Sequence, residues 1–188
     1  MTLRRLFVPL VIMAVLVGIG IVGVGRTTFG QGGQGGQTAA ATLKVDKIVV
    51  LKAARRMKLL YRGRVVRTYS IALGFAARGH KTTEGDGKTP EGLYRIDARN
   101  PNSSFHLSLR ISYPNARDRA QARRRGVSPG GQIFIHGQPS RLSAAVGAAG
   151  NVIALPGDWT LGCIAVSNRQ VREIWHAVRI GTPVELRA

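Results

Sequence analysis

A run of 19 residues without a charged side chain, Leu6 to Val24, constrains this chain more than any other feature. A helix rises about 1.5 Å per residue, so a helical run of this length reaches about 30 Å, the thickness of a bilayer's hydrocarbon core. Arg4 and Arg5 precede the run. Because positive flanks stay in the cytoplasm, we expect residues 1–25 to cross a membrane and the rest of the chain to be exported.

The length of the apolar run also bears on cleavage. The hydrophobic region of a signal peptide usually has about 7–15 residues, so the longer run favours an uncleaved anchor over a signal segment that is removed. Gly23 to Gly25 could still serve as a small-residue cleavage site. Residues 26–41 are rich in Gly and Gln, which is typical of a flexible linker.

The net charge and the cysteine content limit which partners and which kinds of site this chain can have. The chain has 188 residues and a formal net charge of +19, which favours anionic partners such as nucleic acid, a membrane or wall surface, or an acidic substrate. Export argues against nucleic acid. A single cysteine excludes an internal disulfide, and no His pair has metal-ligand spacing, so we predict neither a metal nor a cofactor.

Residues 42–188 are expected to form one domain that is mainly β. Short β-branched runs, bounded by Gly, Pro and Asn, predict strands. The expected strands are Val45 to Leu51, Met57 to Tyr61, Arg64 to Leu73, Gly92 to Ile96, Ile133 to Ile135 and Pro183 to Leu186. The second and third should form a hairpin around Arg62-Gly63, and we expect a mainly antiparallel sheet or sandwich.

Two helices complete this prediction. The first should open at Asn115 and stop at Gly126. The second should be capped by Ser167 or Asn168 and end at Gly181, because apolar residues repeat at helical spacing between them.

The lone thiol is the first candidate for chemistry. Free cysteine is most often a buried small hydrophobe, which is the simplest interpretation of Cys163. Against this, Gly162 allows close backbone approach to a ligand, and an exported protein that keeps one unpaired thiol risks its oxidation. Cys163 is therefore a candidate nucleophile.

A cysteine nucleophile needs a base, and the chain has four histidines. His136, which precedes Gly137 at the end of an apolar strand, is the best placed, because a strand end holds a side chain rigidly. We expect His80 to lie in a solvated loop, although it could also line a cleft. His106, in a strand-like stretch, should be structural, and His176 should lie on a helix surface or half in the core. Trp159, beside the cysteine loop, could belong either to the hydrophobic core or to the wall of a cleft.

Several stretches together resemble the L,D-transpeptidase (YkuD-type) catalytic domain of bacterial peptidoglycan enzymes, especially its YafK-like branch. These stretches are DKIVVLKAARRMKLLYRGRVVRTYSIALG, GHKTTEGDGKTPEGLYRI, SYPNARDRA, PGGQIFIHG, WTLGCIAVSN and GTPVEL. Their order along the chain from about Asp46 to Leu186 carries the resemblance.

The resemblance implies a role for each motif residue. Cys163 would attack the peptide stem at the bond between meso-diaminopimelate and D-Ala, with Thr160 and Gly162 completing its motif. His136 would be the base, oriented by a backbone carbonyl near Gly137. The amides of Gly162 and Cys163 would bind the oxyanion, and an amine would resolve the acyl-enzyme.

Two positions depart from the pattern of many members, which have His before the Gly-Cys pair and Arg or Asn two residues after the Cys. Here Leu161 and Ala165 occupy these positions. This leaves a same-fold hydrolase or amidase, acting on peptidoglycan or on its lipoprotein link, as an alternative. A non-catalytic basic wall-binding protein is a third.

The resemblance also implies a place in the cell. With the expected anchor, it predicts a single-pass protein of the bacterial inner membrane, with its catalytic domain on the periplasmic or wall side. The acceptor amine and the oligomeric state stay open.

Overall fold

The computed structural model describes residues 43–140 and 156–188. The expected membrane segment, residues 1–25, and the expected linker, residues 26–41, lie outside the described residues. Within the described ranges, no helix is both long enough and apolar enough to span a bilayer.

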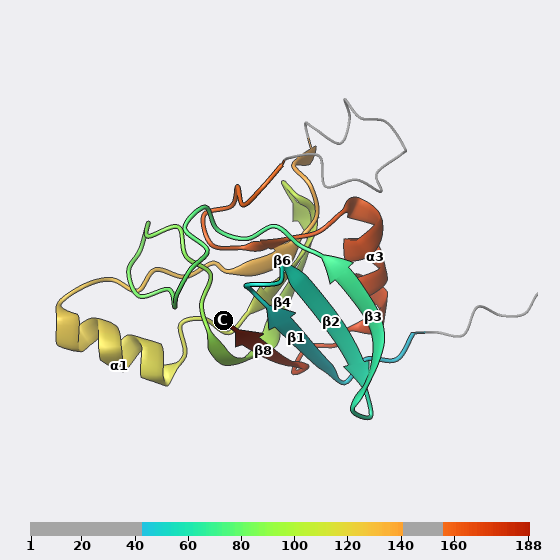
Figure 1. Cartoon of the computed structure of the whole chain (residues 1–188), viewed down its shortest axis with the longest axis horizontal. Helices are drawn as coiled ribbons and strands as arrows, with labels where there is room; N and C mark the ends of the chain where they lie inside the picture. The colour runs from blue at the N-terminus through green and yellow to red at the C-terminus, as the bar shows by residue number, and fades with distance from the viewer. Residues whose placement is uncertain (1–42, 141–155) are drawn as a thin grey trace, which may run out of the picture. The chain divides into compact units, whose positions relative to one another are not determined.

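Eight strands form one sheet in the order β3-β2-β1-β8-β4-β5-β6-β7 (Figure 1). The strands are β1 (Lys47–Leu51), β2 (Arg56–Tyr61), β3 (Arg64–Ser70), β4 (Gly92–Ser103), β5 (His106–Ile111), β6 (Phe134–His136), β7 (Ile164–Ala165) and β8 (Pro183–Arg187). Most neighbours are antiparallel, as predicted, but β1 pairs with β8 and β6 pairs with β7 in parallel.

The expected hairpin is confirmed between β2 and β3, which pair antiparallel around Arg62 and Gly63. Both turn residues have positive φ, 50° and 74°, as a two-residue turn that matches strand twist requires. The second strand is shorter than expected, because it ends at Ser70. Beyond it, Ala72 and Gly74 make only isolated bridges to Ala165 and Thr160 near the cysteine.

The longest strand, β4, differs most from its prediction. The predicted strand ends at Ile96. In the structure β4 continues to Ser103 and pairs with β5, which begins at His106 in the stretch expected to be strand-like. Two register irregularities in this pair accommodate the residues that do not fit a regular ladder.

The two expected helices are both present in the described residues. Helix α1 (Ala116–Arg125) has a capping box between Asn115 and Asp118 and ends at the left-handed Gly126, as predicted. Helix α3 (Asn168–Ala177) is capped by Ser167 but stops before the predicted Gly181, because Val178 already has extended backbone. In Figure 1, α1 lies to one side of the strands, whereas α3 lies against the sheet and contacts β5 and β6.

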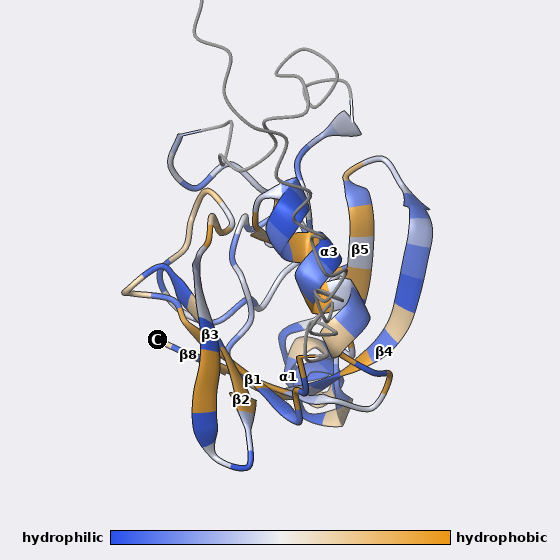
Figure 2. Ribbon diagram, turned by 90° about the vertical axis from the view of Figure 1, so that its right-hand side faces the viewer, coloured by the Kyte–Doolittle hydropathy of each residue, from blue (hydrophilic) through white to orange (hydrophobic). Residues whose placement is uncertain are grey.

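One hydrophobic core joins the sheet to α3. Val171, Ile174 and Val178 of the predicted helical repeat are buried in it, together with β-strand residues such as Ile135 and Ile164. Figure 2 shows hydrophobic bands along β1, β2 and β3 and an alternation of hydrophobic and hydrophilic bands on α3. This core fixes β6, which ends at the candidate base His136, and β7, which directly follows the candidate nucleophile Cys163.

Candidate active site

His136 ends β6, and Cys163 lies directly before the neighbouring strand β7, so the two residues come close together at one edge of the sheet. Strands β6 and β7 pair in parallel, with Ile135 opposite Ile164. Both isoleucines are fully buried in the core. Because side chains alternate along a strand, His136 and Cys163, each next to one of these isoleucines, face away from that core.

The two side chains share a cavity of about 800 Å³. Its wall includes the rings of Phe105 and Trp159, whose centroids lie 4.5 and 5.7 Å from that of His136. Trp159 is therefore cleft wall, one of its two predicted roles. Residues 130–134 and the exposed Leu161 also line the cavity.

The backbone of the next residue orients the His136 ring. Its Nδ1 lies 2.6 Å from the carbonyl oxygen of Gly137. A carbonyl only accepts, so Nδ1 carries the proton and the Nε2 lone pair is left for a proton donor. Burial lowers the pKa of His136, and the hydrogen bond to Gly137 opposes this only in part, so the imidazole is neutral at pH 7. That is the form a general base needs.

Gly137 is also needed for close packing. A Cβ at this position would lie 2.5 Å from Oδ1 of Asn168, which accepts a hydrogen bond from the Gln138 amide. The absence of a side chain therefore lets the N-terminus of α3 approach the end of β6.

The Cys163 thiol is protonated at rest. Its Sγ donates a hydrogen bond to the carbonyl oxygen of Gln132 at 3.5 Å. Burial raises the pKa of Cys163, whereas the Phe134 amide at the sulfur and the positive charge of Lys81 act in the opposite direction. The thiol must therefore lose its proton during attack, and His136 is the base that shares its cavity.

Thr160 holds the turn before the nucleophile. Its hydroxyl donates to the carbonyl oxygen of Cys163 at 2.8 Å and accepts from the Gly162 amide at 3.1 Å. Gly162 has a φ of +122°, and a Cβ there would lie 2.6 Å from the carbonyl oxygen of Lys88. The motif role expected for Thr160 is thus structural. The Gly162 N–H donates to Thr160 in this structure. The oxyanion role expected for the Gly162 amide therefore stays a prediction.

The other histidines do not line this cavity. His80 accepts from the Glu91 amide at Nδ1 and faces the Asp118 carboxylate 3.3 Å from Nε2, so it joins its loop to α1. His106 lies 2.9 Å from an Arg172 nitrogen, which fits its expected structural role. His80 lies in the predicted loop with its side chain 25% exposed, but tertiary contacts use both of its ring nitrogens, so it is only partly solvated.

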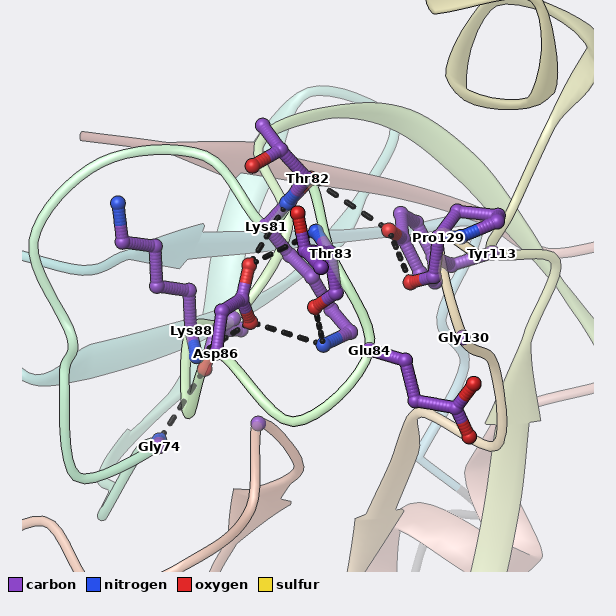
Figure 3. A network of polar contacts seen from close by, with 12 residues as sticks. Gly74, Lys81, Thr82, Thr83, Glu84, Asp86, Lys88, Tyr113, Pro129 and Gly130 are labelled. Atoms are coloured by element: carbon purple, nitrogen blue, oxygen red, sulfur yellow. Dashed lines mark hydrogen bonds and ion pairs between the residues drawn. The ribbon is translucent and has the colours of Figure 1, made fainter. Parts of the chain in front are cut away.

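Lys81, which was not among the residues predicted from sequence, also lines the cavity. Its ammonium group is buried and contacts the Asp86 carboxylate at 2.9 Å (Figure 3). Asp86 also accepts from the amides of Thr82, Thr83 and Lys88. Burial alone would raise the pKa of Asp86, but Lys81 and the three amides outweigh it and lower the pKa to about 2.

Comparison with known proteins assigns the domain to a family. The family model of the YkuD L,D-transpeptidase catalytic domain matches residues 45–186. The chain belongs to this family. The resemblance seen in the sequence is therefore confirmed, and so is the predicted fold, mainly β with two helices.

Individual relatives of this YkuD domain are distant. YafK of Escherichia coli K12, whose name gives it a provisional L,D-transpeptidase role, is 27% identical over 113 residues, which are 59% of this chain and 36% of YafK. The chain thus spans about a third of that relative. The helical cell shape determining protein Pgp2 of Campylobacter jejuni superposes with a TM-score of 0.60 at 25% identity, over 76% of this chain and 47% of Pgp2. Bd1075 of Bdellovibrio bacteriovorus shares the fold, with a TM-score of 0.51 at 22% identity, over 77% of this chain and 48% of that protein.

Proposed function

We propose that this YkuD domain is a peptidoglycan L,D-transpeptidase in which Cys163 is the nucleophile and His136 its base. The observation that carries the proposal is that both side chains line one cavity, His136 from the end of β6 and Cys163 from the residue before the parallel strand β7, and that Nδ1 of His136 is hydrogen-bonded to Gly137. This arrangement leaves Nε2 to accept the thiol proton. Family membership supports a peptide stem as the substrate.

In the first half-reaction, Cys163 Sγ attacks the carbonyl carbon between meso-diaminopimelate and D-Ala. The thiol proton passes to Nε2 of His136 as the carbon–sulfur bond forms. The tetrahedral intermediate then expels D-Ala, whose nitrogen takes that proton, and a thioester remains on Cys163. His136 ends this step neutral.

In the second half-reaction, an amine of another stem attacks the thioester. His136 accepts a proton from the amine, an amide bond forms, and the proton returns to Cys163. If water attacks in place of the amine, the same site acts as the alternative hydrolase. An amidase would differ only in the leaving amine.

The test is to incubate the full-length chain, in detergent, with disaccharide tetrapeptides and to analyse the products by mass. Crosslinked dimers with loss of D-Ala support transpeptidation, and tripeptides alone support hydrolysis. Cys163→Ser should fold but abolish both products, because the hydroxyl has a far higher pKa than the thiol. Unchanged turnover in this variant would refute the nucleophile, and a wall-binding role would then be favoured.

We also propose that residues 1–25 anchor the protein in the bacterial inner membrane, with the catalytic domain on the periplasmic or wall side. The uncharged run Leu6 to Val24 after Arg4 and Arg5 supports this proposal. The full-length chain should then fractionate with membranes. A mature N-terminus after Gly25 in a soluble pool would show that the segment is a cleaved signal.

A further inference from the structure

A buried lysine brings a positive charge to the wall of the catalytic cavity. Lys81 lines the same cavity as Cys163 and His136, although only 3% of the residue is exposed. Burying an ammonium group is costly unless it is paired, and the contact with Asp86 meets that requirement. The positive charge of Lys81 also interacts with the Cys163 sulfur and acts to lower the pKa of Cys163.

The ammonium group retains donor capacity. Of its three N–H bonds, two have partners within residues 43–140 and 156–188: the Thr83 carbonyl oxygen and Asp86 Oδ1, each at 2.9 Å. The negative charge of Asp86 is shared with three backbone amides. Lys81 can therefore give its third N–H to an anionic group in the cavity.

Besides its partner Asp86, the remaining charges around the cavity do not neutralise the Lys81 ammonium group. Glu84 lines the cavity as well, but it is exposed and accepts a hydrogen bond from the Ser128 hydroxyl. His136 is neutral, for the reasons given above. A charge buried in a low-dielectric wall acts more strongly on a bound ligand than an exposed one.

We infer that Lys81 is a specificity-determining residue that binds the carboxylate of the terminal D-amino acid, the leaving residue of the donor stem. The inference rests on the proposed function for the identity of this residue. That carboxylate lies a few bonds from the carbonyl carbon that Cys163 attacks, so it enters the cavity together with the scissile bond. A stem that ends in a neutral amide would leave the third N–H without its anion.

The first experiment measures the anion preference of the cavity without any stem. The chain has one cysteine, so alkylation reports on Cys163 alone. The Cys163 thiolate attacks both iodoacetate and iodoacetamide. The fraction of Cys163 that is thiolate therefore affects both rates equally and cancels from their ratio. We expect wild-type protein to favour iodoacetate by about tenfold relative to glutathione, since hydrogen bonds to charged groups are worth about 1.5–3 kcal/mol.

Two variants of Lys81 and one matched control test the residue. Lys81→Met should lower the ratio to the glutathione value, and Lys81→Arg should keep most of the preference. Lys52 is the control, because it is equally buried and braces the same loop through Gly79 and Thr89 but does not line the cavity. Lys52→Met should keep the wild-type ratio. An equal fall in Lys52→Met, or no change in Lys81→Met, would overturn the inference.

The second experiment compares tetrapeptide stems that end in a free carboxylate or in a carboxamide. We expect wild-type kcat/KM to favour the carboxylate by about ten- to a hundredfold, mainly through KM, and Lys81→Met to lose this preference. Turnover of both stems without a Lys81-dependent preference would refute the inference and leave the proposed function intact. A Lys81-dependent iodoacetate preference without stem turnover would refute the proposed function, and with it the stem as ligand, and would leave Lys81 as an anion-binding residue of the cavity.

Discussion

The Nδ1 atom of His136 lies 2.6 Å from the carbonyl oxygen of Gly137, so the backbone of the very next residue orients the candidate base. A carboxylate in that place would favour the imidazolium form, whereas a neutral carbonyl oxygen does so weakly. Burial then dominates and lowers the pKa of His136. The imidazole is thus held in one tautomer and kept neutral.

Replacing the base should remove most activity. We expect His136→Gln to lower kcat/KM by about 10²–10⁴-fold, the usual loss for a general base. Because His136 is buried between Phe105 and Trp159, the variant should also lose about 1–3 kcal/mol of stability, measured by urea unfolding. His176→Gln on α3 is the control and should retain activity. Equal losses in both variants would reassign the base.

The pH dependence of kcat/KM should show a broad plateau. The form of the enzyme that attacks has a neutral His136 imidazole and a protonated Cys163 thiol. The midpoint of the acid limb should lie below the usual histidine pKa of about 6.5, because burial lowers the pKa of His136. The alkaline limb should lie above the usual cysteine value of about 8.5, because burial raises the pKa of Cys163. An alkylation midpoint of Cys163 near pH 5 would contradict this, since it would indicate a preformed thiolate.

The Thr160 hydroxyl should matter for both stability and rate. Thr160→Val removes the donor to the Cys163 carbonyl oxygen and the acceptor for the Gly162 amide. Unsatisfied buried groups cost about 1–3 kcal/mol, so thermal unfolding should show a loss of that size. Activity should fall as well, because the turn that positions the sulfur loosens. Thr160→Ser keeps the hydroxyl and should resemble wild type, and a matching loss there would assign the effect to the methyl group.

Asp86 should stabilise the fold in a pH-dependent way. Its pKa of about 2 lies below the usual value of about 3.9, so its contribution is present above pH 4 and lost as the pH falls towards 2. That contribution is about 2–3 kcal/mol, of which about 1.5–2 kcal/mol should be lost between about pH 5 and about pH 2.5, measured by urea unfolding. Asp86→Asn should be less stable at pH 5 and should lose less on acidification. Glu84→Gln, at an exposed carboxylate on the same loop, should behave like wild type.

The features predicted correctly from sequence are those that neighbouring residues determine. Helix α1 begins and ends where Asn115 and Gly126 supply its caps. The β2–β3 hairpin turns at Arg62 and Gly63, where positive φ is needed. Both depend on hydrogen bonds and backbone sterics within a few residues. Motif order was also sufficient to identify the family, and with it Cys163 and His136 as the candidate pair.

What only the tertiary structure decided depends on residues far apart in the chain. Strand β7 has two residues and exists because Ile164 pairs with Ile135, which brings Cys163 onto the same face as His136. Lys81 shares its loop with Lys88, and no local pattern separates the two, yet Lys81 enters the catalytic cavity. A residue's burial and its electrostatic neighbours arise from long-range packing, and these set the pKa of Cys163 and the charge of the cavity.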